Sequence, residues 1–415
     1  MSATVRELNQ HFIDLWRECD TGDASLPDLG PSTIPQIQTQ NEKSLLRFLE
    51  QVDTMLSTPP RSRDEAQARQ VRLAAAFRPL AEEALGFTAE QLDLLPSQAF
   101  SEVSEEFVRK ARSFDSKLSA EDIYQAGRNA WTAHGLQWLL DLPVQLTPSI
   151  LAYSLLYPYT DNYLDDPDIP EATKRAFNER FRNRLAGDSL TPANAYEQII
   201  FDLVAMIEEQ YSRSQYLAVF ESLLAIHDAQ GQSLKLLPRA AAPGEVDVLG
   251  LSFYKGGTSV WADGYLVSDL LTGAQRQYTY GHGIFAQLLD DMEDVEQDRN
   301  AGRLTIYSQT ADHRSLDRLA NHTFRFGHRV LLGLDCFDAA GPVRELIRHG
   351  ADLFLIDAIG RTAQNYTPSY LHELEAHSPF RFSFLKEQRD DFFRRHGSLG
   401  KLMETFMLRK APSLA

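Results

Sequence analysis

Residues 287–298 read QLLDDMEDVEQD, and this stretch holds the most informative pattern in the chain. In a helix that turns by about 100° per residue, five polar side chains fall within about a quarter of the surface. They are Asp290, Asp291, Asp294, Asp298 and Gln287. Leu288, Met292 and Val295 occupy the adjoining sector, so the acidic stripe borders an apolar one instead of lying opposite it. We therefore predict a helix whose acidic face lines a cleft.

Carboxylates crowded on one helix face repel one another. Exposed like charges one turn apart cost a few tenths of a kcal/mol. Two unit charges 4 Å apart in a partly buried site interact by roughly 4 kcal/mol at an effective dielectric of 20. A bound cation relieves this repulsion, and Mg²⁺ takes oxygen ligands while keeping positions for water and phosphate. The alternative is a solvated acidic helix. The one-sided clustering of aspartates, together with a second aspartate motif, favours the metal site.

The second motif lies in residues 161–166, which read DNYLDD. Thr147 followed by Pro148 is typical of a helix N-terminus, and Pro167 predicts that the same helix ends near Asp166. Its last turns then carry two aspartates on one face, Asp161 and Asp165. The helix dipole disfavours negative charge at that end, unless a cation lies nearby. An Asp-Pro turn on a surface helix is the alternative, but the acidic segment at 287–298 favours a shared metal site.

Composition excludes several classes of protein. The chain has 415 residues, of which 43% are hydrophobic, as expected of a globular protein. A net charge of −17 argues against a nucleic-acid binder. Two cysteines are too few for a disulfide framework or a cysteine-based zinc site, and we find no signal-peptide core and no membrane-spanning stretch. We expect a cytoplasmic protein, with contact to a membrane surface left open.

Helical patterns cover nearly the whole chain, so the predicted fold class is all-α. Residues 20–40 are rich in Pro, Gly, Ser and Thr and indicate a flexible linker within an N-terminal helical extension, residues 1–140. Residues 141–415 form the predicted main domain. Among its predicted helices are 277–300, which carries the acidic stripe, and 384–409 near the C-terminus. A further N-terminal helix is expected at 42–56.

Two basic residues accompany the acidic motifs. Gly256 and Gly257 predict a helix break, whose exposed backbone N–H groups and Lys255 suit a phosphate. A simple kink with a solvent-exposed lysine is the alternative. Arg303 follows Gly302 just after the acidic segment, and arginine pairs well with phosphate. A surface arginine at a helix terminus is equally compatible with that position.

Together these residues resemble motifs of the class I isoprenoid (terpenoid) synthase superfamily. The later segment is similar to the second aspartate-rich motif of squalene/phytoene synthases, with matching residues Gln287, Leu288, Asp294, Val295, Asp298, Gly302 and Arg303. Asp290 stands where that family usually has Asn, and Thr305 where it usually has Tyr. The triplet of Asp290, Asp291 and Asp294 also resembles the Asp-Asp-x-x-Asp motif of prenyl-elongating synthases and some bacterial terpene synthases.

The earlier segment, with Asp161, Asp165 and Asp166, resembles the Asp-x₃-Asp-Asp motif of squalene/phytoene synthases. The resemblance covers about residues 145–310 and implies an antiparallel helical bundle around a central cavity. It also implies three Mg²⁺ ions that bind with a prenyl diphosphate. The implied metal ligands are Asp161, Asp165, Asp290, Asp291, Asp294 and Asp298, of which Asp161, Asp165, Asp290 and Asp294 are the implied catalytic residues. Lys255, Arg303 and Gln287 are the implied diphosphate-binding residues.

The implied activity is ionisation of a prenyl diphosphate to an allylic carbocation, followed by conversion to a terpenoid product. Head-to-head condensation of two prenyl diphosphates and chain elongation stay open as alternatives, in that order. Readings from other classes are a Mg²⁺-dependent nucleotide pyrophosphatase and a non-catalytic helical scaffold. The expected partner is a prenyl diphosphate and not a nucleic acid, and a homodimer is left open.

Overall fold

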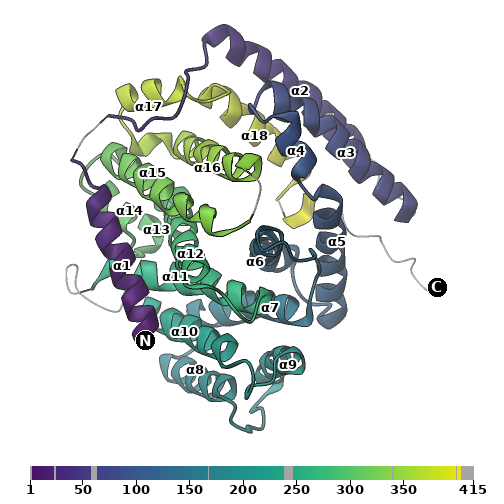
Figure 1. Ribbon diagram of the computed structural model, residues 1–415, viewed down its shortest axis with the longest axis vertical. Helices are drawn as coiled ribbons and strands as arrows, with labels where there is room; N and C mark the ends of the chain where they lie inside the picture. Colours follow the sequence, from purple (N-terminus) through teal and green to yellow (C-terminus); the bar gives the residue numbers. More distant parts are fainter. Residues whose placement is uncertain are drawn as a thin grey trace.

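The computed structural model describes residues 2–22, 25–57, 63–166, 168–237, 246–338, 341–398 and 400–402. Helices make up 78% of the chain and the described ranges hold no strand, so the all-α prediction is confirmed (Figure 1). The α-helices are α1 Ala3–Cys19, α2 Pro35–Leu56, α3 Arg63–Glu83, α4 Ala89–Leu94, α5 Ser97–Phe114, α6 Ala120–Leu139, α7 Pro148–Asp165, α8 Glu171–Ala186, α9 Ala195–Gln210, α10 Leu217–Ser233, α11 Val248–Val267, α12 Gly273–Glu293, α13 Val295–Ala301, α14 Ile306–Ala311, α15 Asp317–Leu331, α16 Gly341–Arg361, α17 Pro368–Glu375 and α18 Phe382–His396. No helix in these ranges is both long enough and apolar enough to cross a bilayer.

The helices α11 and α12 form the centre of the molecule. α11 packs against α12, α10, α6 and α1, and α12 also packs against α15 and α16. One core cluster joins residues from Val5 in α1 to Phe382 in α18, because α1 lies alongside α11 and α15 (Figure 1). Residues from both sides of position 140 thus share one core. The division into an extension and a main domain stays a prediction.

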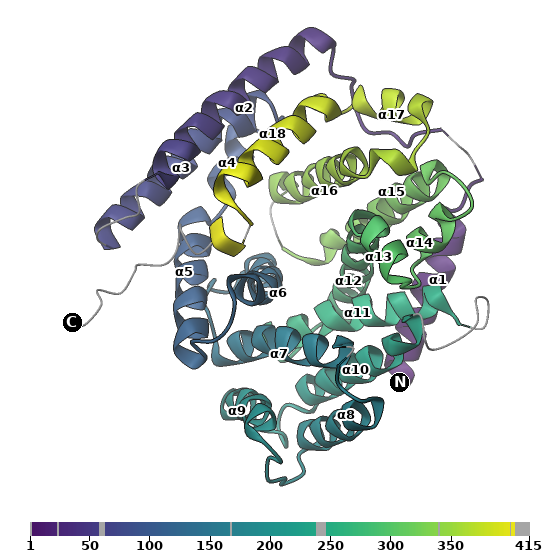
Figure 2. The same cartoon turned by 180° about the vertical axis from the view of Figure 1, so that it is seen from behind.

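The helices α2 and α3 pair at one edge of the molecule, beside α18 (Figure 2). Gln38 of α2 donates to the carbonyls of Glu375 and Ser378, and Arg381 pairs with Glu42. The predicted helix 42–56 begins seven residues earlier, at Pro35, because proline suits the first position of a helix. Among the described residues of the predicted linker, which exclude 23 and 24, only those up to Ile34 lie outside helices.

The predicted break at Gly256 and Gly257 is wrong. α11 runs through both residues without interruption. The glycines allow α11 and α12 to approach closely. A Cβ on Gly257 would lie 2.3 Å from the ring of Tyr280, and one on Gly283 would lie 2.1 Å from the carbonyl oxygen of Gly256. The absence of side chains at these positions therefore serves helix packing, and Lys255 projects from a regular helix.

The predicted helix 277–300 is divided at Asp294. This residue has φ −94° and ψ 8°, and it separates α12 from α13. The amide of Asp294 still donates to the carbonyl of Asp290, and the amide of Asp298 to that of Asp294, so the four-residue spacing of the acidic stripe survives. Gly302 ends α13 in the left-handed conformation, as its position predicts. The predicted helix 384–409 is described only as α18, and residues 403–415 lie outside the described residues.

Candidate functional site

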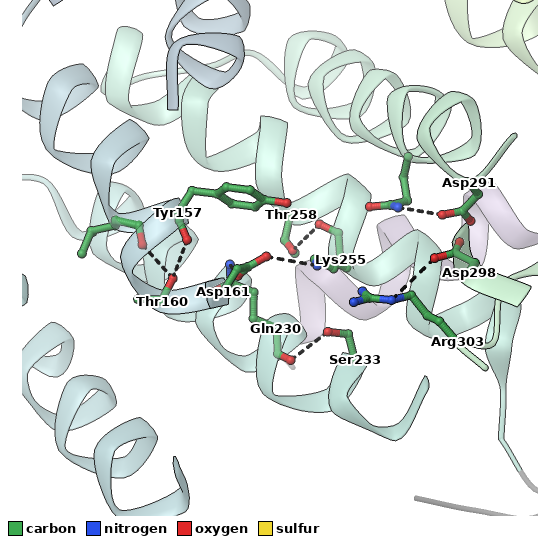
Figure 3. A network of polar contacts seen from close by, with 12 residues as sticks. Tyr157, Thr160, Asp161, Gln230, Ser233, Lys255, Thr258, Asp291, Asp298 and Arg303 are labelled. Carbon is green, nitrogen blue, oxygen red and sulfur yellow. Dashed lines mark hydrogen bonds and ion pairs between the residues drawn. The ribbon is translucent and has the colours of Figure 1, made fainter. Parts of the chain in front are cut away.

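α7 and α11 bring the earlier acidic motif to a lysine. Thr147 caps α7, as predicted, and Asp161 lies in the last turns of that helix. The ammonium of Lys255 lies 3.4 Å from Oδ2 of Asp161, and Nε2 of Gln230 donates to its Oδ1 at 2.7 Å (Figure 3). The side chain of Asp161 is only 15% exposed to solvent, so its ion pair with Lys255 is largely shielded from water.

The later acidic motif carries its own basic partners. A guanidinium nitrogen of Arg128 lies 3.0 Å from Asp290. Nε of Arg303 lies 3.6 Å from Asp298 (Figure 3). Arg128 comes from α6, 162 residues before Asp290, and no sequence motif pointed to it. The sequence led us to expect a bound cation that relieves the repulsion among the crowded carboxylates. Basic side chains of the protein itself offset part of that repulsion, and the bound cation stays a prediction.

Tyr157 shows that the two motifs share one neighbourhood. The charge of Lys255 lowers its pKa, while Asp161, burial and Asp290 raise it, and the net pKa is about 12. Tyr157 belongs to α7, so the influence of Asp290 on its pKa shows that the charge of α12 reaches the helix that carries Asp161. Lys255 likewise acts on Asp298 from a distance. The side chains of two separate segments therefore converge, with the lysine between them (Figure 3).

Asp291 is the most deeply buried of the predicted metal ligands. Its side chain is 4% exposed and accepts hydrogen bonds from Gln287 at 2.8 Å and from Ser252 at 3.2 Å. Burial raises its pKa to about 7, Asp290 and Asp298 add to the rise, and the hydrogen bonds oppose it. Gln287, a predicted diphosphate contact, is thus engaged with Asp291.

The pKa values of two further aspartates are also raised: Asp294, the N-cap of α13, and Asp298, in the middle of that helix. The pKa of Asp298 is raised to about 6, with burial as the largest cause; the charge of Arg303 opposes the rise, and the charges of Asp294 and Asp290 add to it. Burial, followed by the charges of Asp290 and Glu293, raises the pKa of Asp294. Repulsion among these carboxylates therefore persists despite the arginines. Asp165 ends α7, but its side chain lies outside the described residues.

A narrow cavity of about 90 Å³ extends from Lys255 into the core. Its lining residues are Asn129, Tyr153, Leu156, Tyr157, Thr160, Phe181, Leu185, Leu223, Ile226, His227, Gln230, Lys255, Ser259 and Gln287. A second, polar hollow beside it is lined by Asp161, Lys255 and Arg303, among others. The cavity is smaller than ligand clefts of about 300–1,000 Å³. Side chains must therefore move to admit a substrate larger than a few waters.

The donor set favours magnesium shared with a phosphate. No group of three or more His, Cys, Asp or Glu side chains in the described ranges is placed to hold a metal ion. Mg²⁺ is usually held by one or two carboxylates, and waters and substrate phosphates complete its coordination. Carboxylate oxygens lie on two facing walls, and carboxyl groups of one wall have raised pKa values. This set suits a magnesium ion shared with a phosphate and not one enclosed by protein ligands alone.

Comparisons of the chain with protein-family models, with curated proteins and with solved structures found no match. The resemblance to class I isoprenoid synthases therefore rests on the sequence motifs and stays a prediction. Of the residues around the site, Arg128, Gln230 and His227 were not identified from the sequence. Each lies on a helix without a motif. The packing of α10 against α11 and α8 brings Gln230 and His227 to the cavity, and Arg128 of α6, a helix that packs against α7 and α11, reaches Asp290.

The raised pKa of Asp291 has a measurable consequence for stability. A carboxyl that titrates at about 7 when folded and at about 3.9 when unfolded loses its stabilising contribution as the pH rises between these values. The full difference is at most about 4 kcal/mol. Asp291→Asn keeps the size of the side chain and cannot ionise. We expect this variant to be more stable than the parent at pH 8 without metal, by up to that amount, in urea unfolding experiments.

The matched control is Asp202→Asn, because Asp202 is exposed on α9. This variant should have the same stability as the parent at pH 8. At pH 4, where the parent's Asp291 is protonated, the advantage of Asp291→Asn should vanish. An Asp291→Asn protein that is less stable than the parent at pH 8 contradicts the assignment of a destabilised carboxylate.

Proposed function

We propose that the chain is a Mg²⁺-dependent class I isoprenoid synthase with the isoprenoid synthase fold. It ionises a prenyl diphosphate and converts the allylic carbocation to a terpenoid product. One observation carries the proposal: acidic side chains of α7 and of α12–α13 converge on Lys255 at the mouth of a mainly apolar cavity. In the proposal, metal and diphosphate bind at the polar end, and the hydrocarbon part of the substrate occupies the apolar end.

Each wall has a defined role in the proposal. Asp161 and Asp165 hold magnesium from α7, while Asp290, Asp294 and Asp298 hold it from the opposite wall. Asp291 and Gln287 are secondary candidates, since they bond to each other. Bound magnesium would neutralise the charge that develops on the leaving diphosphate.

The basic side chains of the site form ion pairs with its carboxylates before a substrate binds. Lys255, Arg128 and Arg303 each pair with an aspartate of the site. When magnesium and diphosphate arrive together, the carboxylates gain a divalent partner and the basic groups gain phosphate oxygens. Arginine binds phosphate through parallel hydrogen bonds, so this exchange of partners favours the bound state. The diphosphate is then held at the mouth, where its charge is offset from several directions.

The walls of the cavity suit the hydrocarbon part of the substrate. Leucine, isoleucine and aromatic side chains exclude the water that would capture a carbocation early. The rings of Tyr153, Tyr157 and Phe181 offer negative faces to a positive charge. The narrowness of the cavity favours one prenyl chain over two. We therefore place cyclisation or elimination ahead of head-to-head condensation and chain elongation.

The first test is thermodynamic. A ligand that binds only the folded state at a hundredfold excess over its Kd raises the free energy of unfolding by about 2.7 kcal/mol. We expect Mg²⁺ with pyrophosphate to stabilise the protein by that amount in thermal or urea unfolding. Mg²⁺ alone or pyrophosphate alone should stabilise the protein much less, because the two bind together in the proposed site.

Asp161→Asn should abolish most of this stabilisation, whereas Asp202→Asn should leave it unchanged. No stabilisation of the parent by Mg²⁺ and pyrophosphate would favour the helical scaffold. Release of pyrophosphate from deoxynucleoside triphosphates, without turnover of prenyl diphosphates, would favour the nucleotide pyrophosphatase.

A further inference from the structure

His227 of α10 lines the same cavity as Lys255 and is 4% exposed. Its Nε2 lies 3.1 Å from the backbone carbonyl oxygen of Asn178 in α8. Its ring packs edge-on against Phe181, with 5.1 Å between the ring centroids. The hydrogen bond to Asn178 and the contact with the ring of Phe181 therefore hold the imidazole in one orientation.

The hydrogen bond determines which nitrogen carries the proton. A carbonyl oxygen only accepts, so Nε2 is the N–H donor. Burial lowers the pKa of His227 to about 4, with Arg182 adding to the fall while the bond to Asn178 and the charge of Asp228 oppose it. The ring is neutral at pH 7, and Nδ1 carries a lone pair. Nδ1 is buried and has no hydrogen-bond partner in the described part of the chain.

The other polar groups of the cavity do not offer a comparable lone pair. Tyr153 donates to the backbone carbonyl of Ser259, and its pKa is raised well above the ordinary value by burial. Gln230 and Lys255 both contact Asp161. Among the described residues, what distinguishes His227 from the other buried histidines with an unpartnered nitrogen is that it lines this cavity, where an unpaired basic nitrogen costs free energy that a proton from a substrate would recover.

We propose that His227 is the base that ends the reaction, by taking a proton from the carbocation through Nδ1. This inference rests on the proposed function. The C–O bond of the substrate breaks with its electron pair leaving on the diphosphate. A C–H bond next to the cationic carbon then breaks, its electron pair forms a C=C bond, and the proton moves to Nδ1. The product is an olefin and not an alcohol.

The burial that keeps the imidazole neutral also favours its return to the neutral form after it has taken a proton. An imidazolium at this position is more acidic than an ordinary one, because burial is the main cause that lowers the pKa of His227 to about 4. It therefore gives up its proton when the product leaves and water enters. The base needs no further group to restore it between turnovers.

The test is the substitution His227→Gln. The amide of glutamine can keep a donor near the carbonyl of Asn178 and places no basic nitrogen at the position of Nδ1. Because ionisation precedes proton removal, we expect diphosphate release within about twofold of the parent. The olefin fraction should fall by about tenfold or more, with alcohols formed by water capture in its place. Diphosphate release and gas chromatography of the products measure the two steps separately.

His134→Gln is the matched control. His134 is a buried histidine of α6 that also has a nitrogen without a partner among the described residues, and it does not line the cavity. This variant should keep the parent's olefin fraction. Should His227→Gln not fold, as judged by its melting curve, His227→Asn carries the same expectation.

The outcomes separate the two proposals. A parent that releases diphosphate, together with a His227 variant that makes the same olefins in the same proportion, overturns the role of His227 alone. A parent whose products are alcohols also overturns it. A parent that releases no diphosphate from any prenyl diphosphate overturns the proposed function, and the role of His227 with it.

Discussion

Replacing Asp290 and Asp294 together by asparagine should lower the rate of diphosphate release from a prenyl diphosphate by about 10³-fold or more. Removal of one electrostatic contact to a developing charge typically costs about 10²–10³-fold, and here two carboxylates are lost. Asparagine preserves side-chain size, so the effect is one of charge. Asp290 also holds Arg128 in place at 3.0 Å, so its loss misplaces a basic partner of the diphosphate. Pyrophosphate release with geranyl, farnesyl and geranylgeranyl diphosphates measures the rate and identifies the preferred chain length.

The control for this double variant is Asp202→Asn. It removes an exposed carboxylate of α9, outside the proposed site, and should leave the rate unchanged. Unfolding in urea shows whether the double variant is folded. We expect it to be no less stable than the parent, since burial and mutual repulsion raise the pKa of Asp294. Turnover by the double variant at the parent's rate, or unchanged binding of Mg²⁺ and pyrophosphate, would remove the later acidic segment from the proposed site.

Gly283→Ala should destabilise the protein by about 3 kcal/mol or more. The new Cβ would lie 2.1 Å from the carbonyl oxygen of Gly256, which belongs to the backbone of α11 and has no rotamer in which to move away. The two central helices must separate to accommodate it. Since α11 carries Lys255 and α12 carries Asp290, the substitution should also disturb the site. Urea unfolding of the ligand-free protein measures the loss of stability.

Gly135→Ala provides the comparison. Gly135 lies in α6, and no atom comes within 4 Å of a Cβ built there. Alanine forms helices better than glycine, so this variant should gain about 0.5–1 kcal/mol. The opposite signs of the two Gly→Ala substitutions isolate close helix packing from helix propensity. Equal stability of both variants would contradict the close approach of α11 and α12.

Local features of the chain predicted the helical class and both ends of α7. Thr147 caps the first turn of α7, which ends at Asp165 as expected, and Gly302 ends α13 with a positive φ. Such signals act within a few residues, through a side chain that bonds a nearby amide or a glycine that adopts positive φ. They are therefore legible without knowledge of the rest of the chain.

The glycine pair in α11 shows where local reasoning fails. A glycine that breaks a helix and a glycine that permits close packing are the same residue in the same kind of context. The difference depends on Tyr280 and Gly283 of another helix, which meet Gly257 and Gly256 only after folding. The predicted break was wrong for this reason, although Lys255 does lie beside the acidic groups.

The amino-acid sequence by itself determined the helical class of this protein and the one-sided spacing of its aspartates, because both follow from periodicity along the chain. Only the tertiary structure decided what surrounds those aspartates. The pairing of Arg128 with Asp290 spans 162 residues, and the contact of Gln230 with Asp161 spans 69. His227 lines the cavity with its Nε2 bonded to Asn178, and this contact exists only because α8 and α10 pack together. Charge neutralisation and burial depend on neighbours in space, and the packing of helices selects those neighbours.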